Sequence, residues 1–240
     1  MPVPRDLVPL GTGGTSGTRT DRVWYASFGS NMHRFRLDFY LAGGRPPGGS
    51  RTYPGCRDAC PPVRSVPVML PGSLYFAHES EVWTGGMAFH DPEGPGETAA
   101  HAHLVTAEQF ADIAAQEMHR PPGSALDLGP VLSTGRAETG PGRYETLLCP
   151  GLLDGFPVLT FTAPWRMDGV PHTRPSATYL RHLASGLAES HGWDADRIGA
   201  YLAGLPGAAG HWSAAEVTAL MNGNGAHGAS RASQGRSRAS

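Results

Sequence analysis

The chain has 240 residues, a formal net charge of −2 and no lysine. A charge balance this close to neutral gives no indication of a broad nucleic-acid-binding surface. The absence of lysine excludes, within this sequence, a Schiff-base lysine and a phosphate-binding P-loop. No apolar run reaches the length of a membrane span, and the N-terminal residues lack the basic-then-apolar order of a signal peptide. With three cysteines, an odd number, we expect a cytoplasmic protein with reduced thiols.

Both ends of the chain differ in composition from its middle. Residues 1–20 are rich in Gly, Thr and Pro, and residues 222–240 consist largely of Gly, Ala, Ser and Arg. Neither segment holds enough apolar side chains to offset the entropy lost on folding, so disorder is predicted for both. The arginines of the second segment could contact a polyanion, although spaced arginines in such a tail are more often simply solvated. Residues 21–221 are therefore predicted to form one domain.

The first predicted elements are a strand over Val23–Ser27, a turn at Gly29 and a helix capped by Asn31. Aromatic and β-branched residues favour the strand, and glycine permits the turn. Asparagine is a good N-cap, and the apolar residues that follow it at helical spacing are Met32, Phe35 and Phe39. A turn that leads into a helix start leaves backbone N–H groups without partners, which is a local geometry that binds small anions.

Short strands alternate with turns in the middle of the chain. The segment from Leu41 to Pro71 is rich in Gly and Pro and is expected to be loop. Strands are predicted over Leu74–His78, Thr84–His90, His101–Val105, Tyr144–Leu148 and Val158–Thr162. Thr106, with Gln109 three residues later, forms a capping box that should begin a helix running to about Met118.

Three further helices are predicted in the C-terminal third, with Ser176, Asp194 and Ser213 as their caps. Glu216 completes a capping box with Ser213, and Gly192 and Gly223 supply stop signals. Several short strands interspersed with a few helices predict an α+β domain, in the form of a small mixed β-barrel with flanking helices.

Glu117 is the candidate catalytic residue. Phe110, Ile113, Ala114 and Glu117 share one face of the predicted helix, so a carboxylate lies on an apolar stripe in the last turn. Burial and the negative end of the helix dipole both disfavour a charged carboxylate, and both should raise its pKa. A carboxylate tuned in this way can act as a general acid and base near neutral pH. Alternatively, the helix ends early and Glu117 faces solvent.

Three separated blocks resemble the γ-glutamylcyclotransferase family. Residues Tyr25 to Met32 read YASFGSNM, similar to the family signature Y-x-x-[YF]-G-S-N-[LM]. Val82-Trp83-Thr84-Gly85 and then Ala115-Gln116-Glu117 resemble the strand block and the block with the catalytic glutamate. The last block, Pro175 to Leu180 with Gly186 and His191-Gly192-Trp193, resembles the terminal helix segment of the family.

The resemblance implies a γ-glutamyl amide or amine as the small-molecule substrate and needs no metal and no cofactor. The α-amino group of the substrate would attack its own γ-carbonyl, expel the amine and leave 5-oxoproline. Glu117 would be the acid and base, and the backbone of Phe28, Gly29, Ser30 and Asn31 would bind the glutamyl group. The loops Leu41–Pro71 and His119–Pro141 would contact the amine half of the substrate.

The chain also departs from the family pattern. Phe28 stands where the family often has tyrosine, and no tyrosine closely follows Glu117. A tyrosine of a late family strand is replaced by Leu, Thr and Phe at positions 159–161. His119 or Arg120 could supply a substitute substrate contact. These departures leave open a non-catalytic small-molecule-binding protein on the same fold, or an enzyme that removes a γ-glutamyl group from a secondary metabolite.

Two other residue sets are weaker candidates for a metal site. His101 and His103 alternate on one predicted strand, which places two imidazoles on one face, with His78 and His90 possible neighbours. Cys56 and Cys60 lie four residues apart, with Cys149 as the only further thiol. No Ser/His/Asp arrangement is evident, so a serine hydrolase is not favoured.

Overall fold

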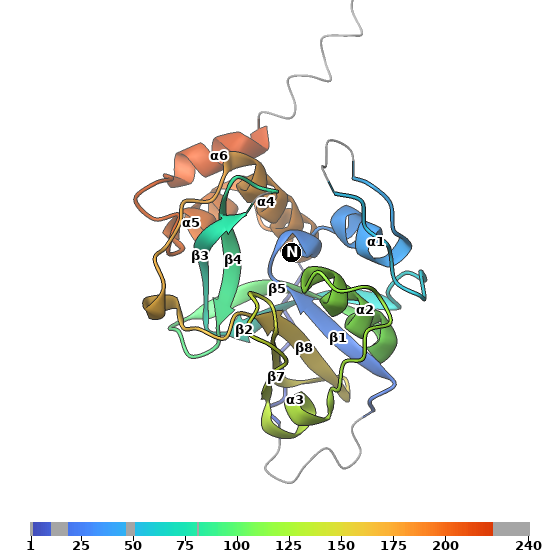
Figure 1. Ribbon diagram of the computed structural model, residues 1–240. Helices are drawn as coiled ribbons and strands as arrows, with labels where there is room; N and C mark the ends of the chain where they lie inside the picture. Colours follow the sequence, from blue (N-terminus) through green and yellow to red (C-terminus); the bar gives the residue numbers. More distant parts are fainter. Residues whose placement is uncertain (1, 11–18, 47–50, 81, 223–240) are drawn as a thin grey trace, which may run out of the picture.

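The structure is a computed structural model that describes residues 2–10, 19–46, 51–80 and 82–222 (Figure 1). Its strands are β1 (Arg22–Ser27), β2 (Arg64–Pro71), β3 (Ser73–Ser80), β4 (Gly85–Asp91), β5 (Glu97–Thr106), β6 (Arg136–Glu138), β7 (Thr146–Leu153) and β8 (Phe156–Thr162). Its α-helices are α1 (Arg34–Ala42), α2 (Ala107–Glu117), α3 (Gly129–Thr134), α4 (Ala177–His191), α5 (Ala195–Gly204) and α6 (Ala214–Asn222). Two short 3₁₀ helices are η1 (Ser30–Met32) and η2 (Met167–Gly169).

The main sheet is mixed and has six strands in the order β2-β5-β1-β8-β7-β6. β1 lies inside it, antiparallel to β5 and parallel to β8, with Trp24 opposite Leu104 on one side and Val158 on the other. β3 and β4 form a separate antiparallel pair. The α+β class is confirmed. Among the described strands, the pairing runs from β2 to β6 and does not show the closure of the predicted small mixed β-barrel.

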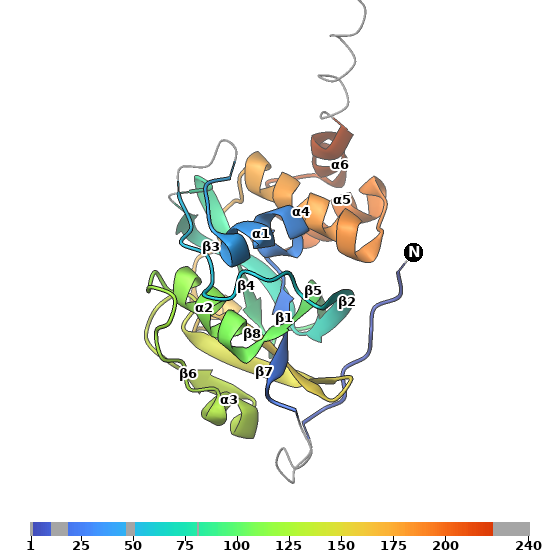
Figure 2. The same cartoon turned by 90° about the vertical axis from the view of Figure 1, so that its right-hand side faces the viewer.

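Both faces of β1 are buried, because helices cover the sheet on two sides (Figure 2). Trp24 and Ala26 belong to the core that β1 shares with α4, α5 and α6. Val23 and Tyr25 point the other way, into the core that β1 shares with α1 and α2. Successive strand residues face opposite sides of a sheet, so this one strand contributes to both cores.

The predicted helix caps from Thr106 onward are confirmed. Thr106 accepts from the backbone of Gln109, whose side chain accepts in return from the backbone of Thr106. Ser176, Asp194 and Ser213 each accept a hydrogen bond from a backbone N–H in the first turn of the helix that follows. Gly192 ends α4 in the left-handed conformation, at φ 63°. Local side-chain chemistry therefore determines these helix starts.

The predicted helix near the N-terminus was wrong in detail. Asn31 is not an N-cap but lies inside η1, and α1 begins after His33, which makes no side-chain cap hydrogen bond. The short 3₁₀ turn changes the helical phase, so the predicted apolar face does not hold. Phe35 is 49% exposed, and the buried face of α1 consists of Arg36, Leu37, Tyr40 and Leu41.

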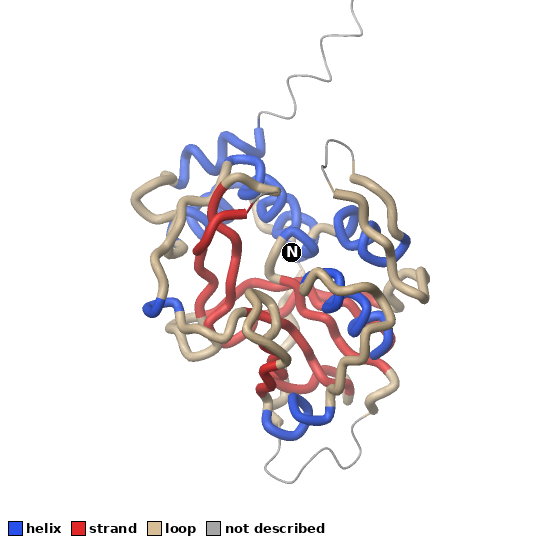
Figure 3. Tube along the Cα trace, in the orientation of Figure 1, coloured by secondary structure: helices blue, strands red, loops and turns tan. Residues whose placement is uncertain are grey.

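The segment from Leu41 to Pro71 is not loop throughout, because β2 occupies its last eight residues. Pro67 lies in β2, and proline is tolerated there because β2 is the edge strand of the described sheet, where β5 is the one strand that pairs with it. The connection from α2 to β7 is mostly loop, as Figure 3 shows, but it contains α3 and β6, which the sequence did not indicate.

Residues 2–10 belong to the segment for which the composition predicted disorder, yet they lie along the sheet. The backbone N–H of Arg5 donates to the carbonyl of Pro67 at 3.0 Å, and Val8 and Leu152 exchange backbone hydrogen bonds. Backbone pairing does not depend on apolar side chains, so composition could not reveal it. Residues 11–18 and 223–240 lie outside the described residues. In the part of the chain that is described, no helix is long and apolar enough to cross a membrane.

Candidate active site

A cavity of about 540 Å³ opens beside the carboxyl end of β1. Its walls come from segments far apart in the sequence: the loop after β1, helix α1, the end of α2, the turn between β3 and β4, and the start of α4. Glu117 and residues 28–31, the predicted site residues, all line it. The fold thus brings together the parts of the chain that the sequence motifs singled out.

Glu117 is the last residue of α2, and its carboxylate faces the cavity. The predicted stripe is present, since Phe110, Ile113 and Ala114 are fully buried below it. Burial raises the pKa of Glu117 above its usual value, while a hydrogen bond from Tyr40 and the nearby charge of Arg51 act in the opposite direction. Glu117 is therefore a half-buried carboxyl whose proton affinity is increased, as the sequence predicted.

The loop from Phe28 to Asn31 reaches Glu117 directly. The side-chain amide of Asn31 donates to Glu117 Oε1 at 3.2 Å and lies 3.5 Å from the hydroxyl of Tyr25. The Asn31 side chain is buried, and its Oδ1 has no hydrogen-bond partner among the described residues. The backbone N–H groups of residues 29–31 also find no acceptor within the described chain. The loop with these unpaired donors and the carboxylate of Glu117 therefore line the same cavity.

Tyrosines line the cavity although the family tyrosines are missing from their expected positions. Tyr40 comes from α1 and hydrogen-bonds Glu117, Tyr179 comes from α4, and Tyr144 comes from the segment before β7. Burial raises the pKa of Tyr25, Tyr40, Tyr144 and Tyr179, so each keeps its proton at neutral pH. Tyr179 lies within the last of the three sequence blocks that resemble the family, whereas no sequence motif indicated Tyr40 or Tyr144 as site residues.

Two arginines also face the cavity, and sequence reasoning missed both. Arg36 is 5% exposed, and its guanidinium lies 5.3 Å from the ring centroid of Trp83 and 5.4 Å from that of Tyr53. The guanidinium of Arg51 lies 5.1 Å from the centroid of the same Tyr53 ring, and Arg51 donates to the carbonyl of Gln116 at 2.9 Å. Arg36 precedes Tyr40 by one helical turn, so a helical register that included Tyr40 could have identified it.

The two candidate substitute contacts have different positions. His119 lines the cavity and has a positive φ of 57°. Arg120 instead forms an ion pair with Glu145, which itself lines the cavity. A direct substrate contact therefore remains a prediction for His119, while Arg120 acts on the cavity wall through Glu145.

The paired histidines support the loop. His101 and His103 lie side by side on β5, with ring centroids 4.2 Å apart. His101 Nδ1 is 2.8 Å from the carbonyl of Met32, and His103 Nδ1 is 2.8 Å from the hydroxyl of Ser65. Within the described residues, no group of three or more His, Cys, Asp and Glu side chains could hold a metal ion. The His101 contact instead fixes the end of η1.

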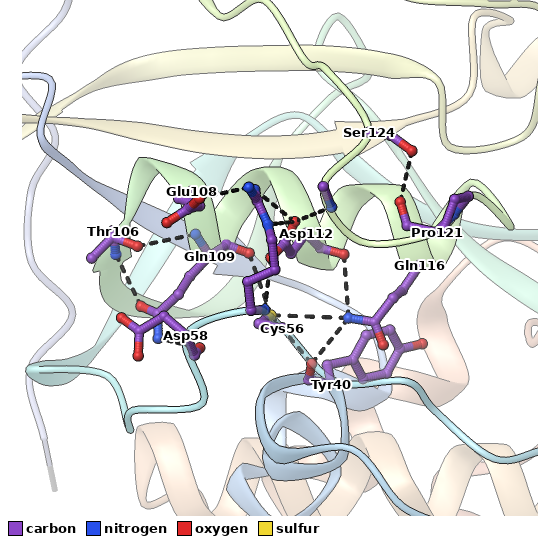
Figure 4. Close-up of polar contacts among 12 residues, drawn as sticks. Tyr40, Cys56, Asp58, Thr106, Glu108, Gln109, Asp112, Gln116, Pro121 and Ser124 are labelled. Atoms are coloured by element: carbon purple, nitrogen blue, oxygen red, sulfur yellow. Dashed lines mark hydrogen bonds and ion pairs between the residues drawn. The ribbon is translucent and has the colours of Figure 1, made fainter.

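A buried polar network holds the end of α2 against α1 (Figure 4). The side-chain amide of Gln116 donates to the carbonyl of Tyr40 at 3.0 Å, and the thiol of Cys56 donates to the same carbonyl at 3.3 Å. Asp112 accepts from the backbone N–H groups of Arg57 and Gly123 at 2.9 and 2.7 Å. Gln116 precedes Glu117 on α2, and Tyr40 belongs to α1. The hydrogen bond between Gln116 and Tyr40 therefore fixes Glu117 relative to Tyr40.

Gly186 sets the approach of α4 to η1. A Cβ atom at this position would lie 2.6 Å from the Met32 Cβ and 3.1 Å from the His33 backbone nitrogen. We expect Gly186→Ala to lower the free energy of unfolding by roughly 1–3 kcal/mol, because it overpacks this contact. It should also slow turnover by displacing residues 30–32. Urea unfolding and an activity assay would measure both effects.

Gly204 provides the matched control in α5, because a Cβ there meets nothing within 4 Å. Gly204→Ala should leave stability unchanged or raise it by up to about 1 kcal/mol. Equal losses in the two variants would contradict the proposed role of Gly186.

No protein-family model matches the chain. Among curated proteins, it is similar to "Histone deacetylase 5" of Arabidopsis thaliana, at 31% identity over 198 residues. This match covers 75% of the chain but spans only 30% of the length of that relative. Among solved structures, it is similar to an uncharacterized protein from Homo sapiens at 14% identity and a TM-score of 0.46, with 84% of this chain and 99% of that chain covered. It is also similar to a structure described as "Gamma-glutamyl cyclotransferase", at 13% identity, a TM-score of 0.43 and the same two coverages.

Proposed function

We propose that the protein is a γ-glutamylcyclotransferase-like enzyme that releases 5-oxoproline from a γ-glutamyl amide or amine. The observation that carries this proposal is the hydrogen bond from Asn31 to Glu117, which joins two motif blocks 86 residues apart. The proposal rests on the motif resemblance together with this contact, the raised pKa of Glu117 and the unsatisfied backbone donors of the loop.

The reaction moves two protons from the α-nitrogen of the substrate to the leaving nitrogen, and one carboxyl group can carry both in sequence. Glu117, as the carboxylate, accepts a proton from the α-ammonium group of the substrate. The freed amine attacks the γ-carbonyl carbon and forms a five-membered ring with a tetrahedral centre. When the bond to the leaving nitrogen breaks, the protonated Glu117 returns the proton to that nitrogen. The regenerated carboxylate then takes the second proton from the ring nitrogen and passes it to the departing amine, so 5-oxoproline and an ammonium ion leave.

The surroundings of Glu117 suit these two roles. Burial increases its affinity for a proton, so the carboxylate becomes a better base than an exposed one. The hydrogen bonds from Asn31 and Tyr40 orient it, and the loop donors at residues 29–31 would hold the glutamyl group in a folded conformation. Such orientation matters because the attacking amine and the carbonyl belong to the same flexible molecule.

The test is incubation of the purified protein with a panel of γ-glutamyl compounds, including glutathione, γ-glutamyl amino acids and γ-glutamyl amines. Mass spectrometry would detect free 5-oxoproline. Formation of 5-oxoproline from any member supports the proposal and names the substrate class. Binding of a panel member without product would favour the non-catalytic alternative. The main support for that alternative is the absence of the family tyrosines from their expected positions, and the tyrosines of the cavity wall weaken this support.

The pH dependence should report on Glu117. Because the group must be ionised to accept the first proton, kcat/KM should rise as pH increases through its pKa. Burial raises that pKa, so the midpoint of the acidic limb should lie above 4.5. The acidic limb should persist in His119→Ala with its midpoint unchanged or higher, because the charge of His119 acts to lower the pKa of Glu117. A midpoint at or below the usual carboxyl value would contradict the assignment.

A further inference from the structure

Helix α1 has no local cap at its N-terminus. Its N-cap residue, His33, makes no side-chain cap hydrogen bond, and its first turn holds no acidic residue. The first N–H groups of a helix have no partner within the helix, so a start without a cap is less stable. The backbone N–H of Arg34, the first residue of α1, therefore needs an acceptor from another part of the chain.

Glu189 supplies this acceptor from α4, which lies beside α1 (Figure 2). The N–H of Arg34 donates to the two carboxylate oxygens of Glu189 at 3.2 and 3.3 Å, although 155 positions separate the residues. His33 Nε2 lies 3.3 Å from Glu189 Oε2, so one carboxylate contacts both the N-cap and the first residue of the helix. Its negative charge also complements the positive end of the α1 dipole.

Neighbouring contacts hold the chain just before α1. Gly186, about one turn before Glu189 on α4, lies so close to η1 that a Cβ atom there would be 2.6 Å from the Met32 Cβ. From the sheet, His101 Nδ1 lies 2.8 Å from the carbonyl of Met32. Glu189 extends this anchor from η1 into α1 itself.

The position of α1 matters because it carries two groups that act on Glu117. Burial raises the pKa of Glu117, while a hydrogen bond from Tyr40 and the charge of Arg36 both oppose that effect. α1 is only nine residues long, so a displaced first turn would move Arg36 directly and Tyr40 with it. Glu189 is not among the described residues that line the cavity, so its influence on Glu117 would pass through α1.

We propose that Glu189 is a positioning residue, whose carboxylate caps α1 from α4 and thereby holds Tyr40 against Glu117. Its importance for turnover rests on the proposed function. Its effect on the Glu117 carboxyl does not, because that effect can be measured without any substrate.

The test is an NMR titration of the side-chain carboxyl carbons, in which the Glu117 signal is identified by its absence from Glu117→Gln. Glu189→Ala removes the cap and should raise the pKa of Glu117, because the opposing contacts of Tyr40 and Arg36 weaken. Loss of a distant negative charge by itself would act in the other direction and favour the ionised Glu117. Glu189→Gln loses the charge but keeps an acceptor oxygen for Arg34, so in this variant the pKa should not rise.

Asp194→Ala is the matched control, because Asp194 caps α5 by accepting from the backbone N–H of Arg197 at 2.8 Å. α5 also packs on α4, but none of its residues is among the described residues that line the cavity. This variant should lower the urea midpoint of unfolding and leave the pKa of Glu117 unchanged. An unchanged or lower pKa in Glu189→Ala would overturn the proposal, and so would an equal rise in Asp194→Ala.

Glu189→Asp keeps the test decisive if Glu189→Ala does not fold. It retains the charge on a side chain that is one methylene too short to hold the N–H of Arg34 at the same distance. The pKa of Glu117 should rise in this variant as well, and a native value would count against the cap.

Turnover gives the second measurement. With the best substrate of the γ-glutamyl panel, Glu189→Ala should lower kcat by roughly 10- to 100-fold, whereas Asp194→Ala should stay within a few-fold of the native rate. A native rate in Glu189→Ala would remove the positioning role. If the native protein forms no 5-oxoproline from any member of the panel, the proposed function fails, and the titration of Glu117 still decides whether Glu189 positions α1.

Discussion

Replacing Glu117 by glutamine is expected to lower the rate of 5-oxoproline release by roughly 10²- to 10⁴-fold, the usual contribution of a general acid and base. Glutamine keeps the size of the side chain and can still accept a hydrogen bond from Asn31, but it cannot accept or return a proton. Steady-state assays with the best substrate of the panel would measure the loss. A rate within a few-fold of the native protein would remove Glu117 from the mechanism.

Glu108→Gln is the control for this variant because it changes a carboxylate on the same helix. Glu108 lies in the first turn of α2, is exposed and pairs with Arg57, and it does not line the cavity. Its rate should match that of the native protein. Glu117→Gln should also unfold at a higher temperature than the native protein above the raised pKa, because the folded state then no longer holds a buried carboxylate there.

Replacing Asp112 by alanine is expected to lower the free energy of unfolding by roughly 2–4 kcal/mol at neutral pH. The Asp112 side chain is fully buried and accepts hydrogen bonds from two backbone N–H groups and from the Arg57 guanidinium. Its loss leaves those donors unsatisfied and frees α2 from the segments that it anchors. Urea unfolding followed by circular dichroism would give the value.

The same residue predicts how stability depends on pH. Burial would raise the pKa of Asp112, but the bonds from Arg57 and Gly123 outweigh it and hold the pKa below its usual value. A carboxyl group whose pKa is lower in the folded state stabilises the fold at pH values above its pKa in the unfolded chain. This stabilisation is lost as the pH falls through its pKa in the folded protein. The difference in the free energy of unfolding between the native protein and Asp112→Ala should therefore become smaller at acidic pH. Glu108→Ala, which removes the exposed partner of Arg57, should cost no more than about 1 kcal/mol.

Much of the fold was predictable wherever local chemistry decides it. The caps at Thr106, Ser176 and Asp194 fixed three helix starts, and the alternation of apolar residues located most strands. The first helix was misplaced because a 3₁₀ turn precedes it and changes which residues share its buried face. No capping residue indicates this turn in the sequence. Whether the sheet closes into a barrel depends on pairing between distant strands, and local patterns carry no information on that pairing.

The candidate site was predictable only in part, for the same reason. Glu117 was found because its spacing on one helix places it on an apolar face, and the loop was found by its motif. Tyr40 and Arg36 were missed because they come from the helix whose phase was wrong. Their relation to Glu117 arises from the packing of α1 on α2, which joins residues that the sequence keeps far apart.

The place of β1 in the sheet has a consequence for how the protein is made. β1 is synthesised before the other described strands, yet its two neighbours in the sheet are β5 and β8. Trp24 therefore cannot pair until Leu104 and Val158 have been synthesised. Such long-range pairing is slow, since the entropy of closing a long chain segment is lost before the contacts form. An emerging chain that ends before β8 leaves one edge of β1 unpaired and its apolar faces exposed. Assembly of the loop at residues 28–31 is therefore a late event of folding, and truncated or stalled chains are the species most prone to aggregate.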